Sequence, residues 1–430
     1  MGSPSGAGGD DAAKGRAYVS TVSSRAPGLR VAMVIQRFRP HFSGQGRQVE
    51  LLCRELVKRG LKPTVITSAY GNPTSEETVD GYRVVRLRAD FSPLVDSNRK
   101  SRVHGPMFAA RTFVTLCSHR AFDLVHVHAL TDALYGSWAW ARLTRRPVLF
   151  EMTLLGVDDA VTALNSPHRF SFLRHAIFRR CDGYAAISSA LEQRYHEAGL
   201  SRERMRLLPQ GVDVKEFSPR SNPTLRRELG IPLDSPILIF VGSLIQRKGI
   251  DVVLGTWARI HEAFSDAHLI LVGRNTFPSG DPAGSALRDY FSSLSPTTAA
   301  NVHQLGVQDN VNRLLQIADL FVFPSRREGF GTVMVEAMAC GLPCVVADQP
   351  GITDSIFDKH GTTGVVIPQE DDDAFVAAVT DILSHRSRAV DMGRAARTRA
   401  IEGFNITRIA DSYVDFYASL IRDVGARDGA

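Results

Sequence analysis

The sequence predicts an α/β protein with two doubly wound parallel sheets, one in each half of the chain. Short apolar runs alternate with longer segments whose apolar residues recur at helical spacing, which is typical of parallel strands joined by helices. The second half repeats this alternation. The 430 residues suffice for about two to three domains, and 44% hydrophobic residues are ordinary for a globular chain. We place the domains at 29–218 and 219–404, with a terminal helical segment at 405–430.

The first residues and the cysteines indicate where the protein works. Residues 1–28 are rich in Gly, Ala and Ser and lack the apolar stretch of a secretory signal, so we predict a disordered tail. No apolar run reaches the length that spans a membrane. Five scattered cysteines show no metal-ligand spacing and read as free thiols of a reducing compartment. We therefore predict a cytoplasmic protein.

The first half supplies the expected strands 29–35, 63–68, 82–87, 122–128, 148–151 and 183–187. The loop after the first strand contains Gly44 and Gly46, as in a dinucleotide-binding turn, but Val49 stands where the third glycine belongs. This argues against a dehydrogenase. A helix with apolar residues at helical spacing follows the loop.

Polar residues follow two of these strands. His126 and His128 lie on one face of their strand because side chains alternate with period two. Glu151 ends the next strand, and Asp158 and Asp159 come shortly after it. These acids either line a binding site or, in the case of the two aspartates, cap a helix. Both interpretations remain open.

The second half supplies the expected strands 237–241, 268–273, 302–306, 320–323 and 344–347, after a linker at 219–223 rich in turn-forming residues. The acidic run 371–373 precedes a helix, so charges at a helix start explain it better than a metal site does. No Asp-x-Asp pair ends a strand, and we predict no metal. The last helix is expected at 406–421.

One unit of the second half stands out as a binding site. Its strand ends at Pro324, a glycine-bearing loop follows from Glu328 to Gly331, and Thr332 is expected to cap the next helix. Free N–H groups at the helix start suit a phosphate. Glu336 lies in the apolar helix VMVEAMA, where its carboxylate is costly to bury unless something hydrogen-bonds to it. Vicinal ribose hydroxyls would do so.

This unit, PSRREGFGTVMVEAMACGLPCVV, with seven residues between Glu328 and Glu336, resembles the retaining glycosyltransferases of the GT-B fold, in particular family 4. Three further segments carry the resemblance: FDLVHVH at 122–128, PQGVD at 209–213 with Gln210 in place of Asn, and GSLIQRKG at 242–249. The resemblance implies two Rossmann-like domains facing across a cleft, the first for the acceptor and the second for a nucleotide sugar. It also implies that the last helix crosses back to the first domain.

The resemblance further implies the site residues. Catalytic roles fall to His128, Glu328 and Lys248. Donor binding falls to Gly44, Ser243, Arg247, Lys248, Arg274, Val307, Phe330, Gly331, Thr332 and Glu336. Ser243 stands where many relatives have an arginine that meets the diphosphate, and Arg247 is a candidate to compensate.

The implied reaction is transfer of a sugar from a UDP- or GDP-sugar to a hydroxyl acceptor, with retention at the anomeric carbon and with neither metal nor cofactor. The alternatives are a sugar-nucleotide 2-epimerase, which shares the architecture, and a catalytically silent nucleotide-sugar-binding subunit, suggested by Ser243.

The charge of the first domain indicates what class of acceptor it could bind. Sixteen Lys and Arg stand against seven Asp and Glu between Arg30 and Arg120, so positive charge is concentrated in the first domain. An anionic lipid or lipid-linked acceptor, with peripheral membrane contact near Arg99, Lys100 and Arg102, is one expectation. A small soluble acceptor is the other. We expect no nucleic-acid partner.

Overall fold

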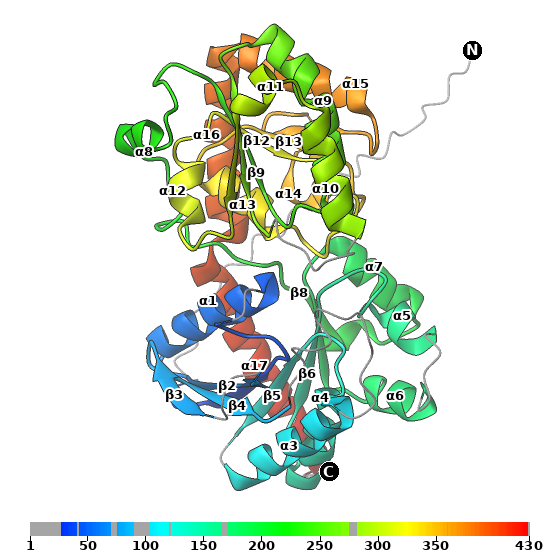
Figure 1. Ribbon diagram of the computed structural model, residues 1–430. Coiled ribbons are helices and arrows are strands. Elements are labelled where there is room, and N and C mark those ends of the chain that lie inside the picture. The colour runs from blue at the N-terminus through cyan, green and yellow to red at the C-terminus, as the bar shows by residue number, and fades with distance from the viewer. Residues whose placement is uncertain are drawn as a thin grey trace, which may run out of the picture.

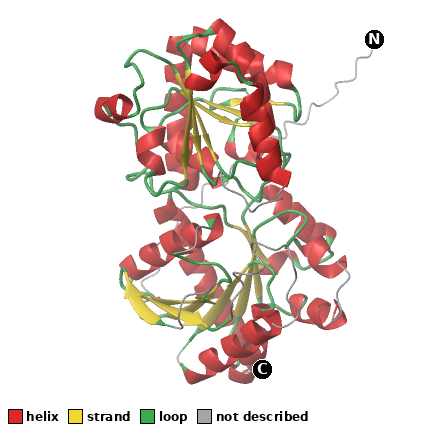
Figure 2. Ribbon diagram, viewed as in Figure 1, coloured by secondary structure: helices red, strands yellow, loops and turns green. Residues whose placement is uncertain are grey.

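The computed structural model describes residues 27–40, 43–69, 75–89, 104–119, 122–165, 171–274, 282–358 and 360–428. Two α/β domains lie one above the other in Figure 1, each with a central sheet flanked by helices, as the colouring of Figure 2 shows. The predicted tail falls almost wholly on residues 1–26, outside the described ranges, and stays a prediction.

The first sheet has eight strands in the order β3-β4-β2-β1-β5-β6-β7-β8. Every neighbouring pair is parallel except β3 with β4. The strands are β1 (Arg30–Val34), β2 (Lys62–Ser68), β3 (Glu76–Val79), β4 (Tyr82–Leu87), β5 (Leu124–His128), β6 (Val148–Met152), β7 (Gly183–Ala186) and β8 (Met205–Leu207).

Helices cover both faces of this sheet. Val31 and Met33 point to the face covered by α1 (Gly44–Lys58) and the last helix, and Ala32 and Val34 point to the opposite face. The remaining helices of this domain are α3 (His104–Ser118), α4 (Ala133–Thr144), α5 (Ala160–Asn165), α6 (Ser171–Phe178) and α7 (Ser189–Glu197), with a 3-10 turn η1 (Arg202–Arg204) before β8.

The second sheet is wholly parallel, in the order β11-β10-β9-β12-β13-β14. Its strands are β9 (Ile237–Val241), β10 (His268–Val272), β11 (Val302–Gly306), β12 (Leu320–Phe323), β13 (Cys344–Ala347) and β14 (Val365–Ile367). Its helices are α8 (Pro223–Glu228), η2 (Gln246–Lys248), α9 (Ile250–Ala263), α10 (Pro282–Ser293), α11 (Pro296–Ala300), α12 (Val311–Leu315), α13 (Thr332–Ala339), α14 (Thr353–Ile356), α15 (Asp372–Ser384) and α16 (Arg386–Phe404).

The last helix, α17 (Ile406–Asp428), leaves the second domain and packs on the first sheet beside α1 (Figure 1). Arg59 of α1 fixes it by an ion pair with Asp411 at 2.6 Å and a hydrogen bond to the Thr407 carbonyl at 2.6 Å. The predicted architecture, two doubly wound domains with a returning final helix, is confirmed.

Two details of helix starts bear on the sequence predictions. Gly331, with φ of +82°, is the N-cap of α13, so the expectation that Thr332 caps this helix is wrong; Thr332 is its first residue. Asp371 caps α15 by accepting a hydrogen bond from the Ala374 N–H at 2.8 Å, as the helix-start interpretation requires. The chain passes between the sheets from β8 to β9, and the boundary near Ser218 lies in that passage and stays a prediction.

All five cysteines are free thiols. Within the described ranges, no helix combines the length and the apolar character needed to cross a membrane.

Candidate active site

Lys248 and Glu328 meet at the edge where β9 and β12 end. The Lys248 ammonium donates to Glu328 Oε1 at 2.5 Å, and Ser325 Oγ donates to the same oxygen at 2.7 Å. Glu328 is only 7% exposed. Burial lowers the pKa of Lys248, and the neighbouring carboxylate works against that shift. The two predicted catalytic residues of the second domain are therefore in direct contact.

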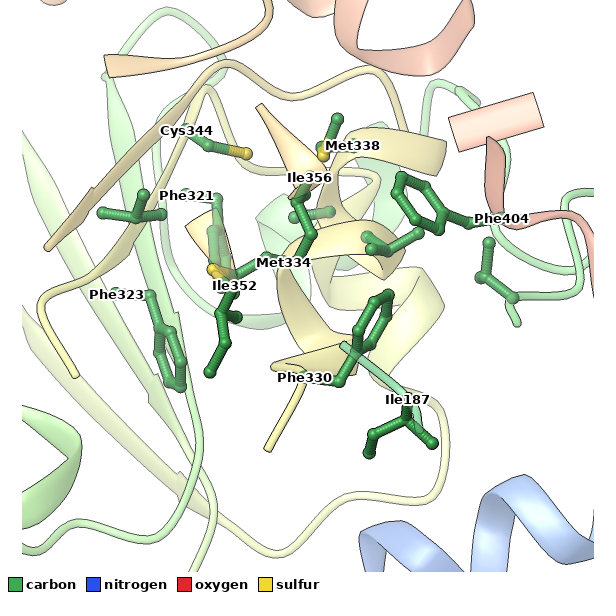
Figure 3. Close-up of a cluster of buried hydrophobic side chains, with 14 of the residues drawn as sticks. Ile187, Phe321, Phe323, Phe330, Met334, Met338, Cys344, Ile352, Ile356 and Phe404 are labelled. Atoms are coloured by element: carbon green, nitrogen blue, oxygen red, sulfur yellow. The ribbon is translucent and has the colours of Figure 1, made fainter. Parts of the chain in front are cut away.

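The start of α13 lies next to this pair. Gly331 has a left-handed backbone conformation that favours glycine, and the helix begins directly after it. Thr332 Oγ1 is hydrogen-bonded to Gln210 of the chain between the domains. The Phe330 side chain is turned into the core toward Phe404 and Ile187, as Figure 3 shows, with its ring centroid 5.6 Å from that of Phe404. Only the main chain of Phe330 is thus oriented to serve a ligand.

Three other predicted donor residues follow neighbouring strands on the same edge. Main-chain hydrogen bonds connect their loops, from Leu244 N to the Arg274 carbonyl at 3.0 Å and from Gly273 N to the Gly306 carbonyl at 2.8 Å. Ser243, Arg274 and Val307 are therefore brought together. Arg247 donates to the Arg327 carbonyl at 2.7 Å, and its guanidinium lies 4.0 Å from Glu328 Oε1, so it reaches the loop although it follows another strand.

Glu336 is on α13, one turn beyond the helix start. No described side chain makes a hydrogen bond or ion pair with its carboxylate. Burial raises the pKa of Glu336 to about 7, with Arg47 lowering it and Glu216 raising it. Arg47 itself pairs with Glu216 at 3.0 Å. Since Arg47 is in the first turn of α1, which begins at Gly44, the predicted Gly44 turn faces the same region as Glu336.

His128 ends β5 on the same face as His126, as predicted, and its side chain is buried. Its Nδ1 lies 3.2 Å from Glu151 Oε1, and the two residues are register partners on neighbouring parallel strands. Tyr413 of α17 donates to Glu151 Oε2 at 2.6 Å, and Tyr417 contacts His126 Nδ1 at 2.9 Å. The returning helix thus completes the surroundings of His128.

The two domains touch beside this site. A Cβ on Gly329 would lie 1.7 Å from the Thr153 carbonyl oxygen, so only glycine allows this approach. A second contact joins Ala190 N to the Gly351 carbonyl at 3.1 Å. A small cavity of ≈ 20 Å³ remains within the first domain, between its sheet, α1, α17 and the segment that leads to the second domain, and the residues that line it include Gln48, His128, Glu151, Gln210, Gly211 and Tyr413.

Asp158 and Asp159 shape the loop that makes the Gly329 contact. Asp158 accepts hydrogen bonds from the N–H groups of Thr153 and Leu154 at 2.9 and 2.6 Å, and Asp159 accepts from the Thr162 N–H at 3.0 Å. Burial raises the pKa of Asp158 to about 6, while these hydrogen bonds work in the opposite direction. These contacts support a structural role for the two aspartates rather than a role in lining a site.

One cluster in the described part of the chain has the donor set of a metal site: His126, His128 and Glu151, whose ligand atoms lie within 4.8 Å of one another. Hydrogen bonds to the two tyrosines and between His128 and Glu151 already use several of these atoms. The expected absence of a metal stays a prediction.

A larger hollow of ≈ 470 Å³ lies at the opposite edge of the first sheet, where strands begin; Arg30, Lys62, Arg83 and His119 are among its lining residues. Arg83 is already paired with Glu76 at 2.6 Å. Six more of the cations counted in this domain are also in ion pairs: Arg39, Arg47, Arg54, Lys58, Arg59 and Arg86. Arg99, Lys100 and Arg102 lie outside the described residues.

Sequence reasoning missed three contributions to the site. Tyr413 lies in the expected last helix, and its partner Glu151 is 262 residues away. Glu216 and its pairing with Arg47 had no sequence signal. Gln210 was noticed only as a replacement for Asn, and the structure connects it to Thr332. A charged residue inside the apolar strand VLFEM was the one usable sign of a buried network.

Comparison with known proteins covers most of the chain. Residues 42–216 match the family described as Glycosyltransferase Family 4, and residues 221–399 match Glycosyl transferases group 1. N-acetyl-alpha-D-glucosaminyl L-malate synthase of Bacillus anthracis is 29% identical over 302 residues, 70% of this chain and 76% of that protein.

Solved structures share the fold. Sucrose-phosphate synthase of Thermosynechococcus elongatus superimposes with a TM-score of 0.76 at 22% identity, over 92% of this chain and all of that one. Anabaena Alr3699/HepE in complex with UDP-glucose gives a TM-score of 0.69 at 17% identity, over 91% of this chain and all of that one.

Proposed function

The chain belongs to the glycosyl transferases of group 1 and family 4, and we propose that it transfers a sugar from a nucleotide-sugar donor to a hydroxyl acceptor. The donor is a UDP- or GDP-sugar, the anomeric configuration is retained, and no metal takes part. That the enzyme is a glycosyltransferase follows from its family. The donor, the stereochemistry and the independence from metal are the proposal.

The observation that carries the proposal is the position of Lys248 beside the start of α13. A leaving nucleoside diphosphate gains negative charge as the bond to the sugar breaks. The Lys248 ammonium and the free N–H groups at the beginning of α13 are fixed donors at the strand edge where such charge would develop. They would perform the task that a divalent cation performs in metal-dependent transferases.

Glu336 supports a nucleotide donor. Its carboxylate is partly buried without a described partner, an arrangement that costs free energy unless a ligand supplies hydrogen-bond donors. The vicinal hydroxyls of a ribose are such donors. UDP-glucose, the ligand of Anabaena Alr3699/HepE, contains that ribose, which is consistent with this assignment.

The sugar would then lie between Glu328 and His128. Glu328 is in the second domain beside Gly329, where the domains touch, and His128 is in the first domain at the end of β5. We assign Glu328 the role of an ion-pair partner for the positive charge that develops on the sugar ring, rather than that of a nucleophile. His128 contacts the sugar from the acceptor side.

The test is product analysis. The purified protein is incubated with a panel of UDP- and GDP-sugars, with and without candidate hydroxyl acceptors, and products are identified by mass spectrometry. Release of nucleoside diphosphate with a glycosylated acceptor or free sugar is expected, and NMR of the product gives the anomeric configuration. Conversion of the donor to an isomeric nucleotide sugar would show an epimerase, and no turnover with bound donor would show a silent subunit.

The acceptor side needs its own experiment. An anionic lipid acceptor predicts weak, salt-sensitive sedimentation with anionic vesicles that is lost when Arg99, Lys100 and Arg102 are all changed to Ser. Absence of sedimentation at low salt would leave a small soluble acceptor.

A further inference from the structure

Glu151 is a carboxylate inside an apolar strand. It is 5% exposed and lies in β6, whose other residues are all buried and apolar. An isolated carboxylate in such a place costs several kcal/mol, so its partners decide its state. Burial acts to raise the pKa of Glu151, but His128 and His126 beside it outweigh burial and hold the pKa well below its ordinary value. Glu151 is therefore an ionised group that can only accept hydrogen bonds.

Three polar groups face its two oxygens. His128 Nδ1 lies 3.2 Å from Oε1. The Tyr413 hydroxyl donates to Oε2 at 2.6 Å, and His126 Nε2 faces the same Oε2 at 3.4 Å. One oxygen thus has a single neighbour and the other has two.

These contacts settle the tautomer of His126. Burial and the neighbouring His128 lower the pKa of His126 to about 4, so its ring is neutral near pH 7 and carries one N–H. The Tyr417 hydroxyl, 2.9 Å from Nδ1, can donate to it, and the thioether of Met33 at 3.9 Å is a much weaker competitor for that proton. The proton of His126 is then on Nε2, toward Glu151.

The same reasoning applies to His128. Its Nδ1 faces an acceptor-only oxygen, so the hydrogen bond requires a proton on Nδ1. Its Nε2 is buried and has no hydrogen-bond partner among the described atoms. His128 also lines the cavity of ≈ 20 Å³ beneath the segment that leads to the second domain, which is roughly the size that holds one water. With the proton on Nδ1, Nε2 is left as a hydrogen-bond acceptor beside this cavity.

We propose that Glu151 is a positioning residue that holds His128 with its proton on Nδ1 and its Nε2 free to accept a hydrogen bond from a hydroxyl group that reaches this cavity. Tyr413 supports this arrangement by orienting the carboxylate, so the final helix α17 contributes to the site as well as to the fold. The identity of the hydroxyl as one of a sugar donor or acceptor rests on the proposed function. The orientation of His128 does not.

The asymmetry at Glu151 gives a sharp test. In Glu151→Gln, the amide oxygen should take the position of Oε2, because two donors face it. The NH₂ group is then placed against His128 Nδ1 and requires that nitrogen to accept. The proton of His128 must move to Nε2, so a change of one oxygen to nitrogen reverses which ring nitrogen is free.

The first readout is ¹⁵N NMR of histidine-labelled protein without ligands at pH 8, with His128→Gln used to assign the signals. Wild type is expected to show a protonated Nδ1 and an unprotonated Nε2 at His128, and Glu151→Gln the reverse. Glu55→Gln is the matched control, because Glu55 is equally buried but pairs with Lys58 and Arg59 of α1. A protonated Nε2 in wild type overturns the proposal even if Glu151→Gln does not fold.

The second readout is kinetic and needs a nucleotide sugar that turns over. Glu151→Gln is expected to lower kcat about 10- to 100-fold, with a much smaller change in KM, because a reacting group is misdirected while donor contacts persist. Tyr413→Phe should keep the tautomer and lower kcat less, whereas Tyr195→Phe, which removes a hydroxyl bonded to the Ser201 carbonyl, should change nothing. Wild-type kcat in a folded Glu151→Gln would refute the positioning role. Absence of turnover in wild type would instead count against the proposed function, and the NMR result would still stand.

Discussion

The Lys248 ammonium and the Glu328 carboxylate lie 2.5 Å apart, joining the loops that follow β9 and β12. Both groups are largely shielded from water, and Ser325 donates to the same carboxylate oxygen. The pair therefore holds Lys248 in one place before any ligand arrives. Such a fixed cation costs little reorganisation when charge develops on a leaving group, which is the property that transition-state stabilisation needs.

Lys248→Met should therefore lower kcat by about 10²- to 10³-fold, the usual effect of removing one fixed donor to a developing anion. Methionine keeps the length of the side chain and removes its charge. The measurement is initial-rate kinetics with a donor that wild type turns over. Lys62→Met, at the exposed start of β2, is the matched control and should behave like wild type. Because Glu328 loses its partner, thermal unfolding is measured in parallel, and an unchanged kcat in a folded variant would contradict the assignment of Lys248.

Glu336→Ala should weaken donor binding by roughly 1–3 kcal/mol, because the ribose hydroxyls lose their acceptor. Isothermal titration calorimetry with the nucleoside diphosphate measures this directly. Glu262→Ala, on the exposed surface of α9, provides the control. Equal affinities of wild type and a folded Glu336→Ala protein would show that the ribose lies elsewhere.

Glu336 should also affect the folding stability of the ligand-free protein. Its pKa is about 7 in the folded protein against an ordinary 4.5. Below pH 4.5 the Glu336 carboxyl is protonated in both the folded and the unfolded protein, so it does not lower the folding stability. Between about 4.5 and 7 the unfolded chain releases the proton and the folded chain keeps it, so stability falls as pH rises, and above 7 the loss is constant.

Glu336→Gln is accordingly expected to be more stable than wild type by about 1–3 kcal/mol at pH 8, with the difference vanishing near pH 4.5. Urea unfolding at several pH values tests this. A difference that does not depend on pH would mean that Glu336 is ordinarily solvated and titrates in its usual range.

Whether an element could be predicted depended on whether neighbouring residues in the sequence determine it. β12 and β13 were predicted with their observed bounds because a buried parallel strand is a short apolar run between turn residues. β3 was missed because its residues, EETV, are mostly exposed at the edge of the sheet and carry no apolar pattern. The N-cap of α13 was assigned to Thr332 because hydroxyl residues usually cap helices, whereas here the chain needs the left-handed conformation of Gly331.

Contacts between side chains were harder to predict from the sequence. The pattern of β5 placed His126 and His128 on one face, and their ring centroids are indeed 3.9 Å apart. That Glu151 would lie between these histidines and Tyr413 depends on strand order and on the path of α17, neither of which is encoded in local spacing. Conversely, Asp158 and Asp159 carried the ordinary signature of turn and cap residues, and their hydrogen bonds agree with it.

Chelation should leave activity unchanged. Lys248 and the N–H groups of α13 would take the part of a cation at the diphosphate. Rates are compared before and after dialysis against EDTA, and the metal content of the protein is measured by mass spectrometry. Loss of turnover that Mg²⁺ or Mn²⁺ restores would defeat the metal-free mechanism.

Gly329→Ala should act on the contact between the domains. A Cβ at this position would lie 1.7 Å from the Thr153 carbonyl oxygen and 3.3 Å from Leu154 Cα, so the two loops must separate. Thr153 belongs to the loop that Asp158 holds by two main-chain hydrogen bonds, and Gly329 adjoins Glu328, so neither side yields without moving site residues. A displacement of about 1 Å can cost on the order of 10²-fold in rate, and we expect a loss of kcat of that size.

The control is Gly255→Ala in α9, where an added Cβ meets nothing within 4 Å and the substitution should be neutral or slightly stabilising. Small-angle X-ray scattering of Gly329→Ala should show a larger radius of gyration than wild type if the domains separate as argued. Because Gly329 lies in the loop between β12 and α13 and not in a sheet, the unfolding temperature of Gly329→Ala should change little. Wild-type kcat in Gly329→Ala would mean that the approach of Thr153 to Gly329 is not needed in the catalytic cycle, and the site would then have to work with the domains further apart.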